Sequence, residues 1–288
     1  MKVCLFFLSV LFTAAAGAEI TVIDQQQREV TLEKPAQRII ALAPHIVENV
    51  FSAGAGDKLV GVVSYSNYPP RASDITVVGD YQAWSLEAIV ALEPDLIVMW
   101  ASGNGIRKLE SLTRLGVPIY VSEPRSLADI PATIRSIGAL AGTEAVSAAE
   151  ATRVEAEIER LSLAYQTRPI IEVFYQVWNE PLQTINGDHL ISRVLELCGA
   201  RNSFYNALSL APKISVESVL HKNPDAIVAS GMGDARPDWL DEWLDYPFLT
   251  AVQQQALIFV DPDYLQRPTA RLLIGAAELC QKLDDVRK

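Results

Sequence analysis

The sequence has little of what marks a protein that binds nucleic acid or holds zinc. Its 24 lysines and arginines are outnumbered by 35 aspartates and glutamates, so the formal net charge is −11 at pH 7. No basic cluster forms a stripe that could neutralise a phosphate backbone. The three histidines, His45, His189 and His221, show no zinc-ligand spacing. The sequence therefore argues against nucleic acid as a partner and predicts no site for a free metal ion.

Long apolar runs are also missing beyond the N-terminus. No later stretch approaches the roughly 20 apolar residues that a helix needs to cross a bilayer. Half of all residues (50%) are nonetheless hydrophobic, and 20% are charged. This composition is typical of a globular chain, because disordered chains do not reach such apolar content. We therefore expect a folded mature protein that does not span the membrane.

Signatures of common enzyme classes are absent as well. The sequence has no Gly-x-Ser-x-Gly turn, no phosphate-binding loop, no His-Glu-x-x-His motif and no paired catalytic Cys and His. The Gly-x-Gly turns at 103–105 and 231–233 carry little information by themselves. We expect a binding protein with no catalytic residues and no catalytic cofactor. A secreted α/β hydrolase or metalloenzyme is the alternative from a different class.

The first 18 residues predict a cleavable signal peptide. Lys2 supplies a positive charge, residues 3–12 are almost uniformly apolar, and the Ala-Gly-Ala at 16–18 is acceptable to signal peptidase. The apolar core is too short to anchor the chain, and Cys4 lies at its start, whereas a lipid-bearing Cys would follow it. We predict cleavage after Ala18 and a soluble product outside the cytoplasm. A buried N-terminal strand or a membrane anchor is the alternative.

Removal of the signal peptide leaves two cysteines, Cys198 and Cys280. An even pair in an oxidising compartment is typical of one disulfide bond. Such a bond would close a loop of about 80 residues and stabilise the fold by about 4 kcal/mol in the loop-entropy model. Two buried free thiols are the alternative.

One pattern occurs twice in the chain, at 85–98 and at 215–228. Each copy has a Ser-x-Glu start, a Pro-Asp pair and an apolar segment. It therefore predicts a capped short helix, a turn and a buried strand, which is one step of a parallel α/β sheet. The order upstream also matches, with strands at 38–42 and 171–176 and helices at 46–53 and 189–198. The sequence predicts two α/β lobes with the same architecture.

A single helix is expected between the lobes. Residues 144–166 contain no Gly or Pro, and apolar side chains recur with helical spacing from Val154 to Tyr165. At 1.5 Å per residue, this helix would extend about 30 Å along the back of both lobes. Without hinge strands, we expect small-amplitude closure. The predicted division is a signal peptide (1–18), an N-terminal α/β lobe (19–143), a backbone helix (144–167) and a C-terminal α/β lobe (168–288).

Aromatic residues follow several of the predicted strands. Ligands of parallel α/β sheets bind beyond the carboxyl ends of the strands. The strands predicted at 61–64, 96–99, 173–176 and 257–260 are followed by Tyr65, Trp100, Trp178 and Tyr264, respectively. Aromatic faces with a few polar groups suit a large, flat, partly apolar ligand, although each aromatic could instead pack in the core or rim. We predict a ligand cleft between the lobes.

Three polar residues carry further hypotheses. His45 follows the strand at 38–42 and is a candidate axial ligand for a metal-centred cofactor, or else a buried or helix-start histidine. Glu87 and Glu217 occupy equivalent places in the two repeats, each in a first helical turn. The helix dipole stabilises a carboxylate there by about 0.3–1 kcal/mol. Alternatively, the two acids dock onto basic residues of a two-fold symmetric partner.

Taken together, these features resemble those of the periplasmic cobalamin-binding proteins of ABC importers. The resemblance covers nearly all of the mature chain and rests on the signal peptide, the paired lobes, the Ser-x-Glu repeats with Pro-Asp, the stretch 61–70, Trp100 and the stretch 194–199. The lobe and helix pattern is shared with siderophore- and heme-binding proteins. The Tyr-Ser-Asn-Tyr-Pro-Pro segment at 65–70 and the cysteine pair point to cobalamin.

The resemblance implies two Rossmann-like lobes, each a mostly parallel sheet with flanking helices, joined by one long rigid helix. It implies a ligand site made of Tyr65, Tyr81, Trp100, Trp178, Asp263, Tyr264, Leu265, Gln266 and Arg267. It also implies that Glu87 and Glu217 dock onto arginines of a permease dimer, and that Cys198 and Cys280 are bonded.

Several positions depart from the family pattern. Tyr81 and Tyr264 stand where the pattern has Trp, and Ala211 stands where a further ligand-facing Trp is expected. Tyrosine keeps a stacking face, whereas Ala211 removes one. We expect a monomeric periplasmic protein that captures cobalamin, a precursor such as cobinamide, or another tetrapyrrole, and delivers it to an ABC permease. Capture of heme or an iron siderophore is the alternative.

Overall fold

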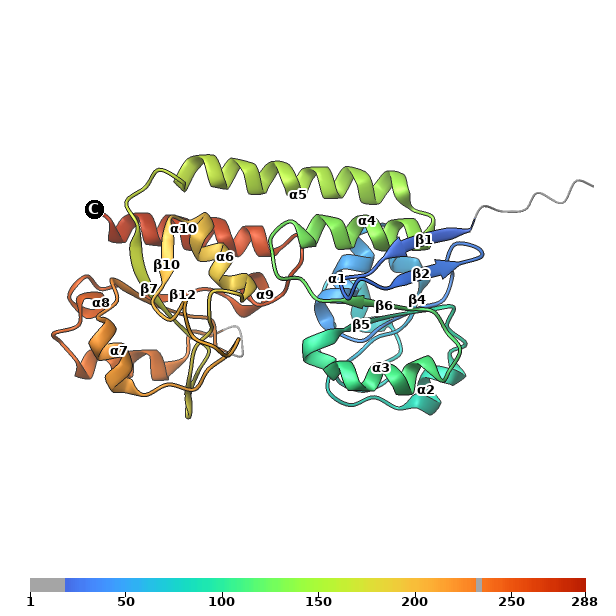
Figure 1. Ribbon diagram of the computed structural model, residues 1–288, viewed down its shortest axis with the longest axis horizontal. Coiled ribbons are helices and arrows are strands. Elements are labelled where there is room, and N and C mark those ends of the chain that lie inside the picture. Colours follow the sequence, from blue (N-terminus) through green and yellow to red (C-terminus); the bar gives the residue numbers. More distant parts are fainter. Residues whose placement is uncertain (1–18, 232–234) are drawn as a thin grey trace, which may run out of the picture.

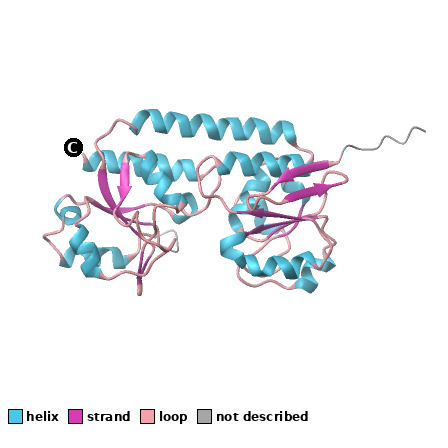
Figure 2. Cartoon of the chain, in the orientation of Figure 1, coloured by secondary structure: helices cyan, strands magenta, loops and turns pink. Residues whose placement is uncertain are grey.

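Two parallel β-sheets of four strands each form the centre of the molecule. The computed structural model describes residues 19–231 and 235–288, so the predicted signal peptide lies outside the described part of the chain. Figure 1 shows the sheets in two lobes that lie side by side beneath one long helix. Both lobes contain helices packed around their strands (Figure 2). The predicted fold class, two α/β lobes joined by a helix, is confirmed.

The N-terminal lobe begins with a two-stranded antiparallel hairpin and continues into its sheet. Its elements are β1 (Ile20–Ile23), β2 (Glu29–Leu32), β3 (Ile39–Ala41), α1 (Pro44–Ser52), β4 (Leu59–Gly61), α2 (Leu86–Ala91), β5 (Leu96–Trp100), α3 (Leu109–Thr113), β6 (Ile119–Ser122) and α4 (Asp129–Ala141). The sheet has the order β4-β3-β5-β6, with all pairs parallel. Apolar clusters cover both of its faces, which is why β3 and β5 are almost uniformly hydrophobic.

The C-terminal lobe repeats this arrangement and adds a small hairpin after its first strand. Its elements are β7 (Ile171–Gln176), β8 (Trp178–Asn179), β9 (Leu182–Gln183), α6 (Leu190–Leu197), β10 (Ala200–Asn202), α7 (Val216–Lys222), β11 (Ala226–Ala229), α8 (Thr250–Gln253), β12 (Leu257–Phe259), α9 (Pro262–Leu265) and α10 (Leu272–Val286). The sheet order is β10-β7-β11-β12, again parallel throughout. In both sheets the first strand lies second, between its two successors.

The repeated Ser-x-Glu and Pro-Asp pattern forms the same structure in both lobes. The hydroxyls of Ser85 and Ser215 cap α2 and α7, accepting hydrogen bonds from backbone N–H groups at 3.1 and 3.3 Å. The carboxylate of Asp95 accepts the N–H of Arg38 at 2.8 Å, and that of Asp225 accepts the N–H of Glu172 at 2.7 Å. Each Pro-Asp pair therefore fixes the start of the neighbouring strand.

Several predicted strand limits differ from those in the structure, and two of these differences concern strands that precede predicted aromatic site residues. The strand expected at 61–64 is β4, which ends at Gly61 because the chain then leaves the sheet edge and Val62 makes only an isolated bridge to Val77. The strand expected at 96–99 runs one residue further, so Trp100 is the last residue of β5 and pairs with Ser122 of β6.

Helix α5 (Glu144–Tyr165) connects the lobes and extends over both of them (Figure 1). Val154 and Leu161 are buried on its inner side. On its outer side, Arg153 and Arg160 pair with glutamates one turn away at 2.7 and 2.6 Å. This amphipathic pattern explains why the helix packs along the lobes as the sequence predicts.

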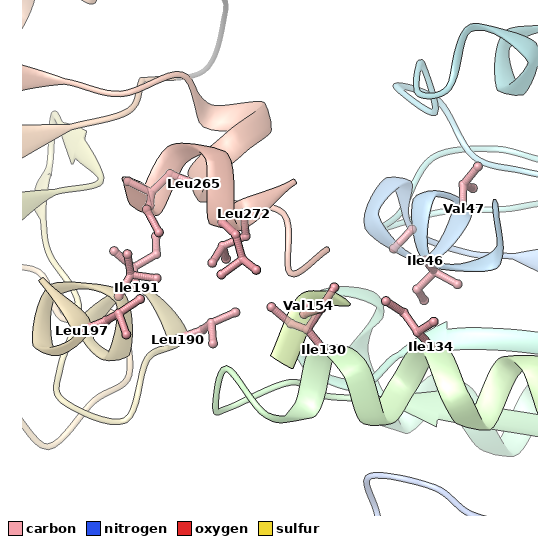
Figure 3. Packing of buried hydrophobic residues seen from close by; sticks show 14 of the residues in the cluster. Ile46, Val47, Ile130, Ile134, Val154, Leu190, Ile191, Leu197, Leu265 and Leu272 are labelled. Carbon is pink, nitrogen blue, oxygen red and sulfur yellow. The ribbon is translucent and has the colours of Figure 1, made fainter. Parts of the chain in front are cut away.

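The lobes share one hydrophobic core. A single cluster of buried residues includes Ile46 on α1, Ile130 on α4, Val154 on α5 and Leu190 on α6, and it continues to Leu272 on α10. Figure 3 shows these side chains approaching one another across the gap between the lobes. Because apolar contacts continue from one lobe to the other, the two lobes are packed together and not merely tethered.

A disulfide bond joins Cys198, at the end of α6, to Cys280 in the middle of α10. Both residues are fully buried in the shared core. The predicted bond is confirmed, and its sequence separation is 82 residues. Within 19–231 and 235–288, no helix combines the length and the apolar character needed to cross a bilayer.

Candidate functional site

A cavity of about 190 Å³ lies between the lobes at the carboxyl ends of their strands. Its lining comes from both lobes and comprises Trp100, Ser102, Glu123, Pro124, Arg125, Tyr175, Val177, Ile185, His189, Leu190, Ile191, Leu210, Leu265, Gln266 and Pro268. We call this the interlobe cavity. A wider groove of about 980 Å³ runs along the edge strand β10, but residues of the C-terminal lobe and the end of the connecting helix line it. Of these two hollows in the described part of the chain, the interlobe cavity lies where a two-lobed α/β fold binds ligands.

Trp100 forms the wall of the cavity on the N-terminal side. The side chain of Asn104 holds this wall in place, since it accepts the N–H of Trp100 at 2.5 Å and donates to the carbonyls of Leu42 and Tyr81 at 2.8 and 2.6 Å. The ring of Tyr81 lies 6.3 Å from that of Trp100, tilted by 36°. Two of the predicted ligand-facing aromatics are therefore neighbours on one preorganised surface.

Tyr65 stands at the rim of the cleft. Its side chain is 78% exposed, and its backbone adopts the left-handed conformation with φ 67°. Arg267 of the opposite lobe donates to the carbonyl of Tyr65 at 3.4 Å and to the side chain of Asn67 at 2.8 Å. The loop that presents Tyr65 is thus held by the other lobe, and its ring is free to contact a ligand.

The predicted segment from Asp263 to Arg267 divides between cavity and lobe interface. Leu265 and Gln266 line the interlobe cavity. Arg267 turns away to pair with Glu48 at 2.8 Å and with Asp263 at 2.7 Å. The ring of Tyr264 packs against the guanidinium of Arg271, 4.7 Å from its centroid.

A buried polar cluster beside the cavity joins the two lobes. Glu48 of α1, only 2% exposed, contacts Arg267 at 2.8 Å, Arg271 at 3.3 Å and the hydroxyl of Thr269 at 3.1 Å. We call these four residues the interlobe clamp. Burial raises the pKa of Glu48, whereas the hydrogen bond from Arg267 and the charge of Arg271 act in the opposite direction. The Arg271 guanidinium also stacks on the ring of Tyr68, 3.9 Å from its centroid.

His45 lies beneath the Trp100 wall. Its ring meets that of Trp100 edge to face, with 5.0 Å between centroids. The residue is 4% exposed, and its Nε2 atom has no hydrogen-bond partner among the described residues. Burial, and next the charge of Arg267, lower the pKa of His45 to about 3, so the ring is neutral at pH 7. A ligand in the cavity would have to displace Trp100 to reach it.

Trp178 and Ala211 lie apart from the cavity lining. Trp178 is in the β8–β9 hairpin, 38% exposed, and its Nε1–H donates to the carbonyl of Glu180 at 2.9 Å. Ala211 is exposed on the neighbouring segment, where its carbonyl accepts from Gln183 at 3.1 Å. Their sequence neighbours Val177 and Leu210 line the cavity, so a ligand that extends beyond the cavity could contact both positions.

Sequence reasoning missed several residues of the cavity. The sequence predicts His189 at the start of a helix and without zinc-ligand spacing, but not at the ligand site; in the structure it caps α6 and lines the cavity. Arg125 and Glu123 form an ion pair at 2.6 Å on the opposite wall. A strand-end search for polar residues as well as aromatics would have found the Glu-Pro-Arg segment that directly follows β6.

Glu87 and Glu217 are exposed at the starts of α2 and α7. The pKa of each lies below its ordinary value, because its own backbone N–H and the hydroxyl of Ser85 or Ser215 donate to the carboxylate. Both acids are therefore ionised at neutral pH, and neither belongs to the interlobe cavity. Across the described residues, no group of three or more His, Cys, Asp or Glu side chains is arranged to hold a metal ion.

Two α/β lobes on a helical backbone, with a preformed cavity between them, define a solute-binding protein of the rigid, bilobed class. The chain belongs to the periplasmic binding protein family, whose model matches residues 39–264.

Curated relatives within this family carry a specific name. The vitamin B12-binding protein of Vibrio campbellii is 35% identical over 255 residues, which cover 88% of this chain and 92% of the relative. That of Pectobacterium atrosepticum is 35% identical over 257 residues, with 87% and 90% covered. The crystal structure of the periplasmic vitamin B12-binding protein BtuF of Vibrio cholerae matches with a TM-score of 0.81 and 34% identity, covering 88% of this chain and 99% of that one. A periplasmic heme-binding protein, RhuT from Roseiflexus, shares the fold at 23% identity and a TM-score of 0.76.

Proposed function

We propose that this protein captures cobalamin, or a closely related corrinoid, between its lobes and delivers it to an ABC transporter permease without catalysing a reaction. The observation that carries the proposal is the match over nearly the whole chain to vitamin B12-binding proteins at 34–35% identity. The heme-binding relatives share less sequence and support the fold alone.

The geometry of the site suits a ligand of this kind. The interlobe cavity is smaller than the roughly 300–1,000 Å³ of pockets that enclose drug-sized ligands. A corrinoid would therefore place only part of its surface in the cavity and extend over the exposed rings of Tyr65 and Tyr81. We propose that Trp178 and the 263–267 segment contact its far side, with Leu265 and Gln266 nearest to it.

Heme or an iron siderophore remains the alternative ligand. Iron capture would need an accessible histidine or tyrosine ligand. His45 has an unpartnered Nε2 atom, but it lies 4% exposed beneath Trp100. Direct coordination through His45 would require the Trp100 wall to move. The observations therefore favour a ligand whose metal is not held by this histidine.

The proposed delivery step uses the two equivalent acids. Glu87 and Glu217 are ionised, exposed and presented by matching helices, which suits a partner with two symmetric basic patches. We further propose that the chain is exported by a signal peptide cleaved after Ala18 and acts as a periplasmic monomer. The organisation that we propose is lobe 19–143, helix 144–167 and lobe 168–288. The interlobe clamp supports a small amplitude of closure, because a wide opening would separate its buried charges.

Calorimetric titration of the mature protein tests the proposal. We expect one-to-one binding of cyanocobalamin at submicromolar affinity, weaker binding of cobinamide and still weaker binding of hemin. Tight hemin binding with a shifted heme spectrum, and no heat of binding with either corrinoid, would show that the ligand is heme and not a corrinoid. Reproducible turnover of an ester panel, lost on mutation of a single residue, would contradict a pure binding role.

A further inference from the structure

His189 holds its ring in one tautomer by capping α6. Its Nδ1 atom accepts the backbone N–H of Ile191 at 3.2 Å. A ring nitrogen that accepts a hydrogen bond carries no proton, so the proton of the neutral imidazole is on Nε2. Nδ1 is engaged with the backbone of α6, and His189 is one of the residues that line the interlobe cavity.

The segment before α6 fixes the position of this ring. The N–H of His189 donates to the carbonyl of Asn186 at 3.3 Å, and the hydroxyl of Ser192 donates to the same carbonyl at 2.7 Å. The side chain of Asn186 donates in turn to the carbonyl of Ala207 at 3.0 Å and accepts the N–H of Asp188 at 3.0 Å. The ring is therefore preorganised before any ligand arrives.

The hydrogen bond from Ile191 engages Nδ1 and leaves Nε2 as the ring nitrogen that can donate to a ligand in the cavity that His189 lines. Other polar groups on the same side of the cavity are occupied. The hydroxyl of Tyr175 bonds to that of Ser230 at 3.0 Å, and the amide of Gln266 donates to the carbonyl of Gly231 at 3.1 Å. Burial, and next the charge of Arg125 across the cavity, lower the pKa of His189 to about 4. At neutral pH the ring is an uncharged donor with one N–H to offer.

We propose that His189 is a specificity-determining residue, which donates one hydrogen bond from Nε2 to a carboxamide oxygen at the edge of the bound corrinoid and does not coordinate its metal. The inference rests on the proposed corrinoid function. Coordination through Nε2 would need the proton to move to Nδ1, where it would face the N–H of Ile191 and remove the cap. Edge carboxamides distinguish corrinoids from heme, which carries carboxylates.

Two substitutions separate the cap from the ligand contact. His189→Asn keeps an acceptor near the place of Nδ1 but loses the donor at Nε2, whereas His189→Gln keeps a donor that reaches the cavity but is a poor cap. We expect H189N to weaken cyanocobalamin binding by about three- to tenfold at an unchanged Tm. We expect H189Q to keep the affinity within about twofold while lowering the Tm by about 2–4 °C. The matched control is H221N, at an exposed histidine of α7 far from the cavity.

A spectroscopic readout completes the test. Diaquocobinamide has exchangeable axial waters, so imidazole coordination would shift its absorption spectrum on binding. We expect no such shift in the wild type. A shift that H189N abolishes would overturn the proposal, as would unchanged affinity in H189N, or affinity losses that follow the Tm in both variants. Titration of the wild-type protein with cyanocobalamin tests the proposed function separately. If the wild type binds no corrinoid, the proposed function is wrong, whatever the two variants do.

Discussion

The two lobes have sheets of the same topology, but they contribute different residues to the interlobe cavity. Both sheets place the first strand second in order, and in both an Asp after a Pro fixes the start of that strand. The residues that face the cavity are not equivalent, however. The N-terminal lobe contributes an aromatic wall at Trp100, whereas the C-terminal lobe contributes a capping histidine and an apolar floor.

This difference shows which features the repeated architecture determines. Equivalent residues, such as Glu87 and Glu217, lie on helices α2 and α7, away from the cavity. Non-equivalent residues lie on the connections after the strands, where the C-terminal lobe also inserts the β8–β9 hairpin. The equivalent residues of the two lobes therefore form the surface proposed to bind a two-fold symmetric partner, whereas the non-equivalent residues form the proposed ligand site.

The largest expected effect comes from the two equivalent acids, Glu87 and Glu217, which are proposed to dock onto the permease. Reversing both acids, Glu87→Lys with Glu217→Lys, should abolish corrinoid uptake in a complementation assay because like charges would then face the basic partner. Cobalamin affinity measured by calorimetry should stay unchanged, since neither acid belongs to the cavity.

The matched control reverses Glu29 and Glu159 to Lys, which are exposed acids away from both repeats. This double variant makes the same change in net charge and should transport normally. Uptake by the Glu87/Glu217 variant at the wild-type rate would contradict the docking role and leave both acids with a role in stabilising their helices.

The disulfide distinguishes the C-terminal lobe from its counterpart. Cys198→Ser with Cys280→Ser should lower the free energy of unfolding by about 2–5 kcal/mol. The reason is that the disulfide, whose cysteines are 82 residues apart in the sequence, would no longer constrain the unfolded chain. Thermal unfolding with and without reductant measures the effect. Reduction should lower the Tm of the wild type and leave the Tm of the double variant unchanged; equal responses would contradict a stabilising bond.

The aromatic walls provide the next comparison. Trp100→Ala should weaken cobalamin binding by about 1–3 kcal/mol, the usual range for a packed aromatic anchor, and Tyr65→Ala should act in the same direction. Trp178→Ala should cost less, because Trp178 lies outside the cavity lining. Titration of the three variants ranks them. Unchanged affinity in W100A would contradict the proposal that the ligand binds in the interlobe cavity. A loss in W178A equal to that in W100A would show that the β8–β9 hairpin is part of the binding site.

The smallest effect concerns acid stability. The pKa of His45 falls from its ordinary value of 6.5 to about 3 in the folded protein. Below pH 6.5 the unfolded chain therefore binds more protons, and the free energy of unfolding falls by about 1.4 kcal/mol per pH unit from this residue. His45→Phe should flatten the profile between pH 6 and 5, as measured by denaturant unfolding. An identical slope in H45F would show that the ring is accessible to protons in the fold.

How far the sequence predicts this molecule depends on the range of each interaction. The α/β lobes, the helix at Glu144–Tyr165 and the caps at Ser85 and Ser215 depend on local spacing, so the pattern predicts them well. The interlobe clamp depends on partners more than 200 residues apart, such as Glu48 and Arg267. The resemblance implies that Arg267 contacts the ligand, and no local pattern in the sequence predicts that it also pairs with Glu48 of the other lobe at 2.8 Å.

The shared core also has a consequence for the order of synthesis and folding. Helix α10 is the last element of the chain, yet Leu272 and Cys280 belong to the same apolar cluster as Ile46 on the first helix. The cluster cannot close until the ribosome has released nearly every residue. The N-terminal lobe can therefore bury its own cluster early, whereas the packing of the two lobes against each other follows the packing of α10.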